Sequence, residues 1–264
     1  MNTVISDVRY ALRTFIRSPV FTLAALFCLA VGIGANTAIF SVLNAVVLRP
    51  LPFPEPERLV TLQETGAQGA NSSFSPADFL DVRGESRTLE DVAGYRTLNA
   101  NLSGVGEPVR VRAVSVSPQF FQVFHVEPIM GRSFLTGDIS ESQETHNVIL
   151  SYRSWQNRFG GQPDVIGTKL QINGAPHIVV GVAPAFFHYP EEVEMWVRSY
   201  PYGVPEPPMS VSEELNTVRS LGYFRVVGRI AAGITLEQVR AEMEVLASRL
   251  QEADDDAPEL TGLA

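Results

Sequence analysis

The stretch SPVFTLAALFCLAVGIGANTAIFSVLNAVVL, residues 18–48, determines how the rest of the chain is organised. Its 31 residues include no Asp, Glu, Lys or Arg. A helix rises about 1.5 Å per residue, so about 20 apolar residues cross the hydrocarbon core of a bilayer. The stretch exceeds this length, and we predict a transmembrane helix over residues 18–48.

Basic residues precede this stretch. Arg9, Arg13 and Arg17 outnumber the single acid Asp7 in residues 1–17. Short flanks with excess Arg stay on the cytoplasmic side, so we expect residues 1–17 inside and the residues after 48 outside. The three arginines are four residues apart and share one helical face. This spacing predicts an amphipathic cytoplasmic arm that contacts either a cytoplasmic partner or anionic lipid headgroups.

A cleaved signal peptide is the alternative interpretation of the apolar stretch. The small residues at 35–38, Ala-Asn-Thr-Ala, offer a cleavage site. The apolar region of a signal peptide usually spans about 7–15 residues. Here the apolar residues continue beyond 38 through Ile39, Phe40, Val42 and Leu43. The length therefore favours an uncleaved helix.

Small and polar residues occupy the second half of the stretch. Ala30 and Gly34 have the small-xxx-small spacing that lets membrane helices approach closely. Asn36 and Asn44 carry amides, which are costly in lipid unless they are paired. Together with Ser41, these residues predict packing against neighbouring membrane helices. For Asn44, a position near the outer interface without such a role is the alternative.

The residues after the stretch are acidic and lack disulfides. The chain has a formal net charge of −9, to which residues 1–17 contribute +2, leaving −11 for the remainder. Nucleic-acid binding needs a basic surface, so nucleic acid is not an expected partner. The one cysteine, Cys28, lies in the apolar stretch. The external fold must therefore depend on its hydrophobic core.

Local signals in the external part alternate between helix and strand. Four prolines at 49–58 predict a stiff, extended neck that holds the domain off the bilayer. Capping signals predict helices that begin at or just after Ser75, Thr88, Ser117, Ser151 and Thr235. Strands are predicted at 59–63, 109–113, 169–172, 178–182 and 223–230, with Asn173-Gly174 as a hairpin turn. The mixture predicts an α+β fold, followed by an acidic tail or linker at 253–264.

Motifs for bond chemistry are missing from the sequence. It has no HExxH, CxxC, GxSxG or GxxxxGK[ST] pattern, and its four histidines have no metal-ligand spacing. The acidic run at 254–256 could bind calcium, but it lacks an EF-hand loop and is better explained as a solvated tail. We expect a protein that is not an enzyme, with no catalytic residue, cofactor or metal. Five phenylalanines are expected in the core rather than in a ligand site: Phe120, Phe121, Phe124, Phe186 and Phe187.

Four segments resemble one known family. They are DVRYALRTFIRSPVFTLAALFCLAVGIGANTAIFSVLNAVVLRPLPFPEPERLV at 7–60, VSVSPQFFQVFHVEPIMGRSF at 114–134, the segment at 149–187, and VVGRIAAGITLEQVRAEMEVLASRL at 226–250. They are similar to MacB-type ABC transporter permeases, and closest to the acidobacterial duplicated branch. The resemblance implies a first transmembrane helix and a periplasmic core domain over 59–252. Within that domain it implies a porter-like part at 59–113 and 215–252 and a β-rich insert at 114–214.

The resemblance also implies a function without bond chemistry. Such permeases transmit the motion of a separate ATPase to the periplasm, and they carry three further membrane helices. We therefore expect the N-terminal part of a permease, crossing the bacterial inner membrane once. Its expected partners are an ABC ATPase, other permease segments or protomers, the lipid bilayer and, as a further candidate, a periplasmic adaptor. The main alternative is a membrane-anchored binding or sensing module without transport; an extracytoplasmic hydrolase is a third.

The topology can be tested by cysteine labelling. We expect a Thr3→Cys probe to be protected from a membrane-impermeant reagent added on the periplasmic side, because the arginines hold residues 1–17 in the cytoplasm. Labelling from that side would contradict the orientation. A mature N-terminus near residue 38 would show instead that the stretch is a cleaved signal peptide.

Overall fold

The protein consists of two compact units, Met1–Leu51 and Pro52–Ala264. The computed structural model describes residues 19–43, 53–66, 69–71, 73–135, 146–190, 192–198, 203–208, 219, 221–253 and 259–263. Arg9, Arg13, Arg17 and Asn44 lie outside these described residues. The expected cytoplasmic arm and the last of the expected helix-packing residues therefore stay predictions.

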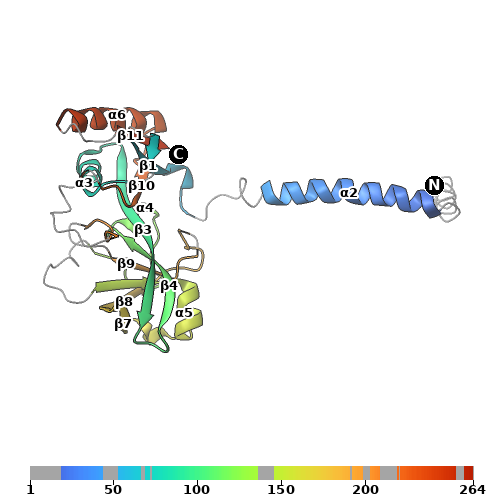
Figure 1. Ribbon diagram of the computed structural model, residues 1–264, viewed down its shortest axis with the longest axis horizontal. Helices are drawn as coiled ribbons and strands as arrows, with labels where there is room; N and C mark the ends of the chain where they lie inside the picture. The colour runs from blue at the N-terminus through green and yellow to red at the C-terminus, as the bar shows by residue number, and fades with distance from the viewer. Residues whose placement is uncertain are drawn as a thin grey trace. The chain divides into compact units, whose positions relative to one another are not determined.

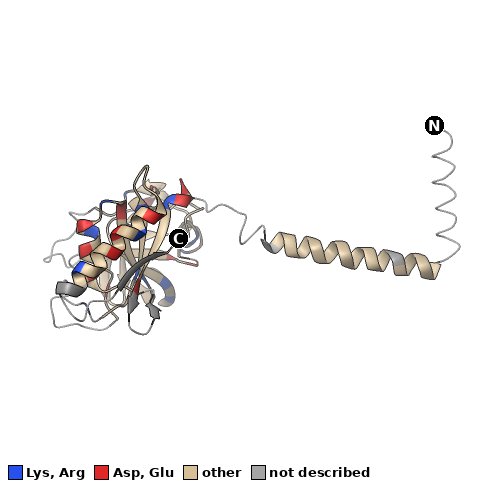
Figure 2. Cartoon of the chain, turned by 90° about the horizontal axis from the view of Figure 1, so that it is seen from above, with Lys and Arg blue, Asp and Glu red and all other residues tan. Residues whose placement is uncertain are grey.

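The first unit contains helix α2, Pro19–Leu43 (Figure 1). Its 25 residues extend about 37 Å, more than the roughly 30 Å of a bilayer's hydrocarbon core. The segment Pro19–Ser41 has a mean hydropathy of 2.0 and is not buried inside the protein. Figure 2 shows α2 without charged residues. By length and composition α2 is a candidate membrane-spanning helix, as the sequence predicted.

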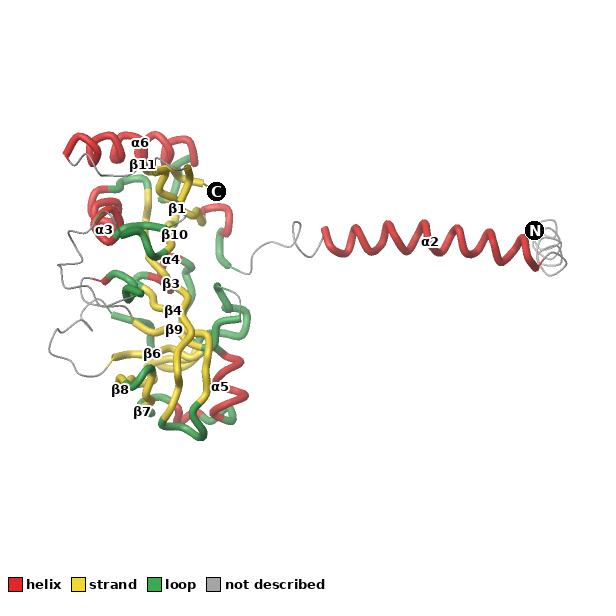
Figure 3. Tube along the Cα trace, in the orientation of Figure 1, coloured by secondary structure: helices red, strands yellow, loops and turns green. Residues whose placement is uncertain are grey.

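The second unit is built on one mixed sheet (Figure 3). Among the described strands the order is β11-β1-β10-β3-β4-β9-β6-β8-β5, with β2 paired to β1 and β7 paired to β3 and β8. The pairs β4–β9 and β6–β8 are parallel, and the other pairs are antiparallel. The strands are β1 Leu59–Gly66, β2 Gly69–Asn71, β3 Leu89–Ser103, β4 Val109–Val116, β5 Met130–Gly131, β6 His146–Leu150, β7 Lys169–Ile172, β8 Ala175–Val182, β9 Met195–Arg198, β10 Arg225–Ile230 and β11 Glu259–Leu263.

Helices pack against both ends and the middle of this sheet. They are α3 Pro76–Glu85, α4 Phe120–Val123, α5 Tyr152–Phe159 and α6 Leu236–Ala253, with the 3-10 turns η2 Pro56–Arg58 and η4 Pro163–Val165. Figure 1 shows α3 and α6 beside β1, β10 and β11 at one end, and α5 beside β7 and β8 at the other. The mixed α+β class predicted from the sequence is confirmed.

Most of the local signals are confirmed. The Ser75 hydroxyl accepts the Asp78 N–H at 3.1 Å at the start of α3, and the Ser151 hydroxyl accepts the Ser154 N–H at 3.2 Å at the start of α5. A reciprocal capping box opens α6, because the Thr235 N–H donates to the Gln238 side chain at 2.8 Å and the Gln238 N–H donates back at 3.3 Å. The predicted Asn-Gly hairpin joins β7 to β8.

One long strand joins three hydrophobic cores. The α6 core contains Phe79, Phe224, Val239 and Met243; the central aromatic core contains Phe53, Phe120, Phe121, Phe124, Phe187 and Trp196; the α5 core contains Val148, Leu150, Trp155, Leu170 and Met195. Strand β3 contributes Val92 to the first, Tyr95 to the second and Leu102 to the third. The three cores therefore share strand β3. Burial of its side chains in each core fixes the register in which β3 pairs with its neighbours.

The helix start predicted at Thr88 is wrong, because Leu89–Ser103 forms strand β3. The Glu242 carboxylate on α6 accepts the Ser86 hydroxyl at 2.7 Å and the Arg87 N–H at 2.8 Å. It also accepts the N–H of Thr88 at 3.1 Å and the Thr88 hydroxyl. Burial alone would raise the pKa of Glu242, but these hydrogen bonds lower it. The distant Glu242 carboxylate therefore accepts the Thr88 N–H, which the side chain at position 91 would accept in a capping box.

Other expectations were modified by tertiary contacts. Where a solvated tail was predicted, Glu259–Leu263 forms β11, which pairs with β1. The boundary predicted between residues 113 and 114 falls inside β4, Val109–Val116, so this strand belongs to both proposed parts. Of the five phenylalanines expected in the core, four are buried and Phe186 is 46% exposed.

Trp155 offers a test of the α5 core. Its side chain is 9% exposed, and its indole N–H donates to the Gln162 carbonyl at 2.9 Å. In the compact unit 52–264, we expect Trp155→Ala to lower the free energy of unfolding by about 3–5 kcal/mol, because it leaves a large cavity. Urea denaturation measures the change, with the exposed Phe186→Ala as control at about 1 kcal/mol or less. Equal losses of stability in both variants would show that Trp155 does not belong to the core.

Candidate functional site

A row of small residues follows one face of α2. The row consists of Ala30, Gly34, Thr37 and Ser41. Their spacings of four, three and four residues place them above one another on a helix of 3.6 residues per turn. A Cβ added at Gly34 would meet no atom within 4 Å. We call this row the small-residue face, and its geometry permits close approach of a second helix.

The small-residue face differs from the set predicted from the sequence. Ala30, Gly34 and Ser41 lie on it, whereas Asn36 leaves the helix about 100° away from Thr37. Thr37 was not among the predicted packing residues, although the spacing from Ala30 would have revealed it. Its hydroxyl donates to the Ile33 carbonyl at 2.8 Å, so its polarity is satisfied within the helix. Asn36 faces a different direction and would need a different partner.

The end of the neck is packed into the second unit. The Phe53 ring lies 5.0 Å from the Phe124 ring and 5.7 Å from the Phe187 ring, and Phe53 is 9% exposed. The chain then turns through Glu55, with φ 47°, into η2. An extended spacer is therefore wrong for residues 53–58, because burial of the aromatic ring outweighs the stiffness of the prolines. Residues 49–52 lie outside the described residues.

A buried guanidinium holds this part of the neck. Arg229 of β10 is fully buried, and its Nε donates to the Val123 carbonyl of α4 at 2.6 Å. Its terminal nitrogens donate to the carbonyls of Pro54 at 3.1 Å and Glu55 at 3.4 Å. Burial lowers the pKa of Arg229, but an arginine stays charged in proteins. The charge is retained because backbone carbonyls replace water around it.

Arg58 makes a second, more exposed attachment. Its Nε donates to the Ile230 carbonyl at 2.8 Å, and its terminal nitrogens pair with Glu55 at 2.7 Å and with Glu90. His125 lies 3.2 Å from the same Glu90 carboxylate. Exposed ion pairs contribute little to stability, so these contacts orient the neck more than they hold it.

A separate buried polar cluster lies at the start of α3. The Ser75 N–H donates to the Glu64 carboxyl at 2.8 Å, and Asp78 pairs with Arg219. Burial raises the pKa of Glu64 to about 8, and the nearby Asp78 charge adds to the rise. Glu64 is therefore mostly neutral at pH 7 in the folded protein. Its contribution to stability falls as the pH rises from about 4.5, where the unfolded chain loses this proton, to about 8. Among the described residues no group of three or more His, Cys, Asp or Glu is placed to hold a metal.

The fold and the attachment define a class of protein. One candidate membrane helix and a mixed α+β domain that follows it in the sequence fit a membrane-anchored protein with a periplasmic domain. The sequence model of the MacB-like periplasmic core domain matches residues 22–246. The chain therefore belongs to the family of MacB-like permeases with this periplasmic core domain. No curated protein sequence matches it significantly.

Solved structures share the fold. The periplasmic region of MacB from Actinobacillus actinomycetemcomitans is 13% identical with a TM-score of 0.54, over 78% of this chain and 88% of that one. A domain of a putative permease from Porphyromonas gingivalis is 19% identical with a TM-score of 0.55, over 80% and 90%. The extracellular domain of the noncanonic ABC-type transporter YknZ from Gram-positive bacteria is 14% identical with a TM-score of 0.53, over 78% and 100%.

Replacing Arg229 tests the attachment of the neck. We expect Arg229→Met to lower the free energy of unfolding of residues 52–264 by about 2–4 kcal/mol, because three carbonyls lose a charged donor. We also expect faster trypsin cleavage after Arg58, since the neck loses its anchor. The exposed Arg225→Met, on the same strand, should leave both measurements unchanged. An unaltered cleavage rate in Arg229→Met would show that Phe53 alone holds the neck.

Proposed function

We propose that this chain is a non-catalytic permease component of a MacB-like ABC transporter. In this role α2 is one helix of a membrane bundle, and the second unit is the part that moves in the periplasm. The observation that carries the proposal is the family match over residues 22–246, which includes most of α2 as well as the domain. The neighbours named as MacB, as a permease and as an ABC-type transporter support it at the level of fold.

The proposed mechanism is the transmission of motion. A separate ABC ATPase would bind and hydrolyse ATP, and permease helices would carry its movement across the membrane to export or displace a substrate. Such coupling requires that the chain after the membrane helix move with the domain. The burial of Phe53 and the hydrogen bonds of Arg229 support this, since they fix residues 53–55 to β10 and α4. No step needs a cofactor or a catalytic residue.

The proposed assembly follows from the same role. Residues 1–17 would be cytoplasmic and the domain periplasmic, in a bacterial inner membrane. The partners would be an ABC ATPase and other permease segments or a second protomer, with a periplasmic adaptor as a further candidate. The division into a porter-like part and a β-rich insert remains part of this proposal. The placement of the α6 core and the α5 core at opposite ends of β3 supports two such parts.

The alternative is a membrane-anchored binding or sensing module without transport. The two functions make different demands on α2. A bundle helix must present a face to protein, whereas a simple anchor contacts lipid all round. The small-residue face is therefore the feature that distinguishes them.

Cysteine crosslinking in native membranes tests this difference. In a Cys28→Ser background, we expect Gly34→Cys and Ser41→Cys to crosslink to another permease segment or protomer, because both lie on the small-residue face. Ile39→Cys is the matched control, since residue 39 lies on the opposite side of the helix. We also expect the uncrosslinked assembly to retain an ABC ATPase on purification, while the chain alone hydrolyses no ATP.

Two results would contradict the proposal. If Gly34→Cys and Ser41→Cys react only with lipid-soluble reagents, as Ile39→Cys does, then α2 is a simple anchor and the sensing module is preferred. ATP hydrolysis or ester hydrolysis by the purified chain alone would show that it is an enzyme.

A further inference from the structure

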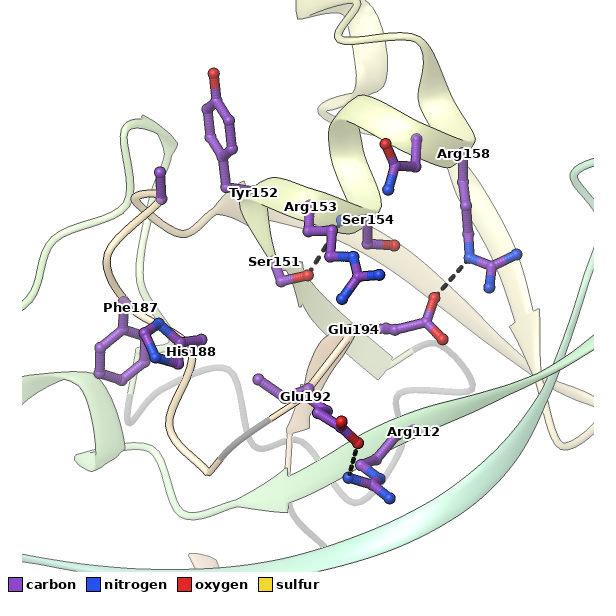
Figure 4. A pocket seen from close by; sticks show the side chains of 13 residues that line it. Arg112, Ser151, Tyr152, Arg153, Ser154, Arg158, Phe187, His188, Glu192 and Glu194 are labelled. Carbon is purple, nitrogen blue, oxygen red and sulfur yellow. Dashed lines mark hydrogen bonds and ion pairs between the residues drawn. The ribbon is translucent and has the colours of Figure 1, made fainter. Parts of the chain in front are cut away.

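A cleft of about 910 Å³ lies beside the start of α5 (Figure 4). Residues of α5 line one side of it, and residues of the β8–β9 connection line the other, with Arg112 of β4 at its edge. Two backbone hydrogen bonds fix this frame: the Ser151 N–H donates to the Glu194 carbonyl and the Glu194 N–H to the Arg112 carbonyl, both at 2.9 Å. The volume lies within the range of small-molecule sites.

Two of the three arginines that line the cleft are paired with glutamates. Arg112 pairs with Glu192 at 2.7 Å, and Arg158 pairs with Glu194 at 2.6 Å. Arg153 lines the same cleft, and its guanidinium has no hydrogen-bond or ion-pair partner among the residues that the structure describes. Among the described lining residues three arginines stand against two glutamates, so this lining has an excess of positive charge on a chain whose net charge is −9. A concave site of this sign concentrates anions.

The start of α5 adds further donors. The Ser151 hydroxyl accepts only the Ser154 N–H, so within the described part of the chain the N–H groups of Tyr152 and Arg153 have no acceptor. Ser154 is 3% exposed and lines the cleft, and its hydroxyl has no partner in the described protein. A buried hydroxyl without a partner is uncommon in folded proteins. The positive end of the helix, two free N–H groups, a hydroxyl and a guanidinium therefore lie together.

We propose that this cleft binds a small molecule through its carboxylate or phosphate group. The anion would accept hydrogen bonds from the N–H groups of Tyr152 and Arg153 and from the Arg153 guanidinium, with the Ser154 hydroxyl beside it. The rest of the molecule would extend toward the rings of Phe187 and His188, on the other side of the cleft (Figure 4). The site uses only residues of the second unit. It therefore stands whether the chain acts in transport or in sensing.

The two tryptophans of the chain provide the signal for a binding experiment. Trp155 directly follows Ser154, and the Trp196 ring lies 5.2 Å from the Phe187 ring, so both sides of the cleft are covered. The full chain in a neutral detergent is titrated with inorganic phosphate, with N-acetylphenylalanine and with the uncharged N-acetylphenylalaninamide. We expect at least one of the two anions to change the fluorescence at concentrations below about 10 mM, and the amide to bind at least tenfold more weakly than the acid.

Variants assign the binding to this cleft. We expect Arg153→Gln to weaken anion binding about tenfold and Ser154→Ala to weaken it less, while both keep the wild-type circular dichroism. Arg87→Gln, which removes an exposed arginine at the α6 end, is the matched control and should bind as the wild type does. Equal losses in Arg153→Gln and Arg87→Gln, measurable binding of the amide that is as tight as that of the acid, or no response to either anion would each overturn the proposal. A response to phosphate but not to N-acetylphenylalanine would identify the ligand class as phosphate.

Discussion

The architecture of the second unit depends on one buried charge. Arg229 lies on β10, between β1 and β3 in the sheet, and its guanidinium is surrounded by carbonyls from the neck and from α4. A charged group removed from water is tolerated only if nearly all of its donors are matched. The neck and α4 must therefore stay where their carbonyls meet this side chain. Their positions in turn bring Phe53 and Phe124 together in the central aromatic core.

This constraint has a mechanical consequence. Pro54 and Glu55 of the neck are fixed to a central strand rather than to a loop or an edge. A displacement of the neck is therefore resisted by the strand pairs on both sides of β10, Leu59–Gly66 and Leu89–Ser103. Close-packed interiors transmit strain because they contain few voids to absorb it. This is the property that a component for the transmission of motion needs, and it requires no catalytic chemistry.

In the second unit the tightly packed α6 end and the proposed ligand-binding cleft lie at opposite ends of the sheet. Its α6 end is stabilised by apolar packing and by Glu242, which binds three consecutive residues before β3. Its α5 end contains the cleft, where Arg153 and Ser154 have side-chain groups without a partner in the described part of the chain. Strand β3 passes through all three cores and so connects the two ends through a continuous ladder. Ligand binding at one end and attachment of the neck near the middle thus share one rigid element.

The sequence by itself determined the features that depend on local physics. The uncharged stretch identified α2, the caps at Ser75, Ser151 and Thr235 located three helices, and Asn173-Gly174 located a hairpin, because each rests on neighbouring residues. Only the tertiary structure decided the outcomes that depend on distant partners. The helix expected at Thr88 is instead strand β3, which pairs with β10 and β4. The neck expected to be stiff and extended is packed by Phe53 and Arg229, and part of the expected tail pairs with β1. The cleft belongs to this second group, since Arg112, Arg153 and Glu194 line it from three separate elements that the sheet brings together.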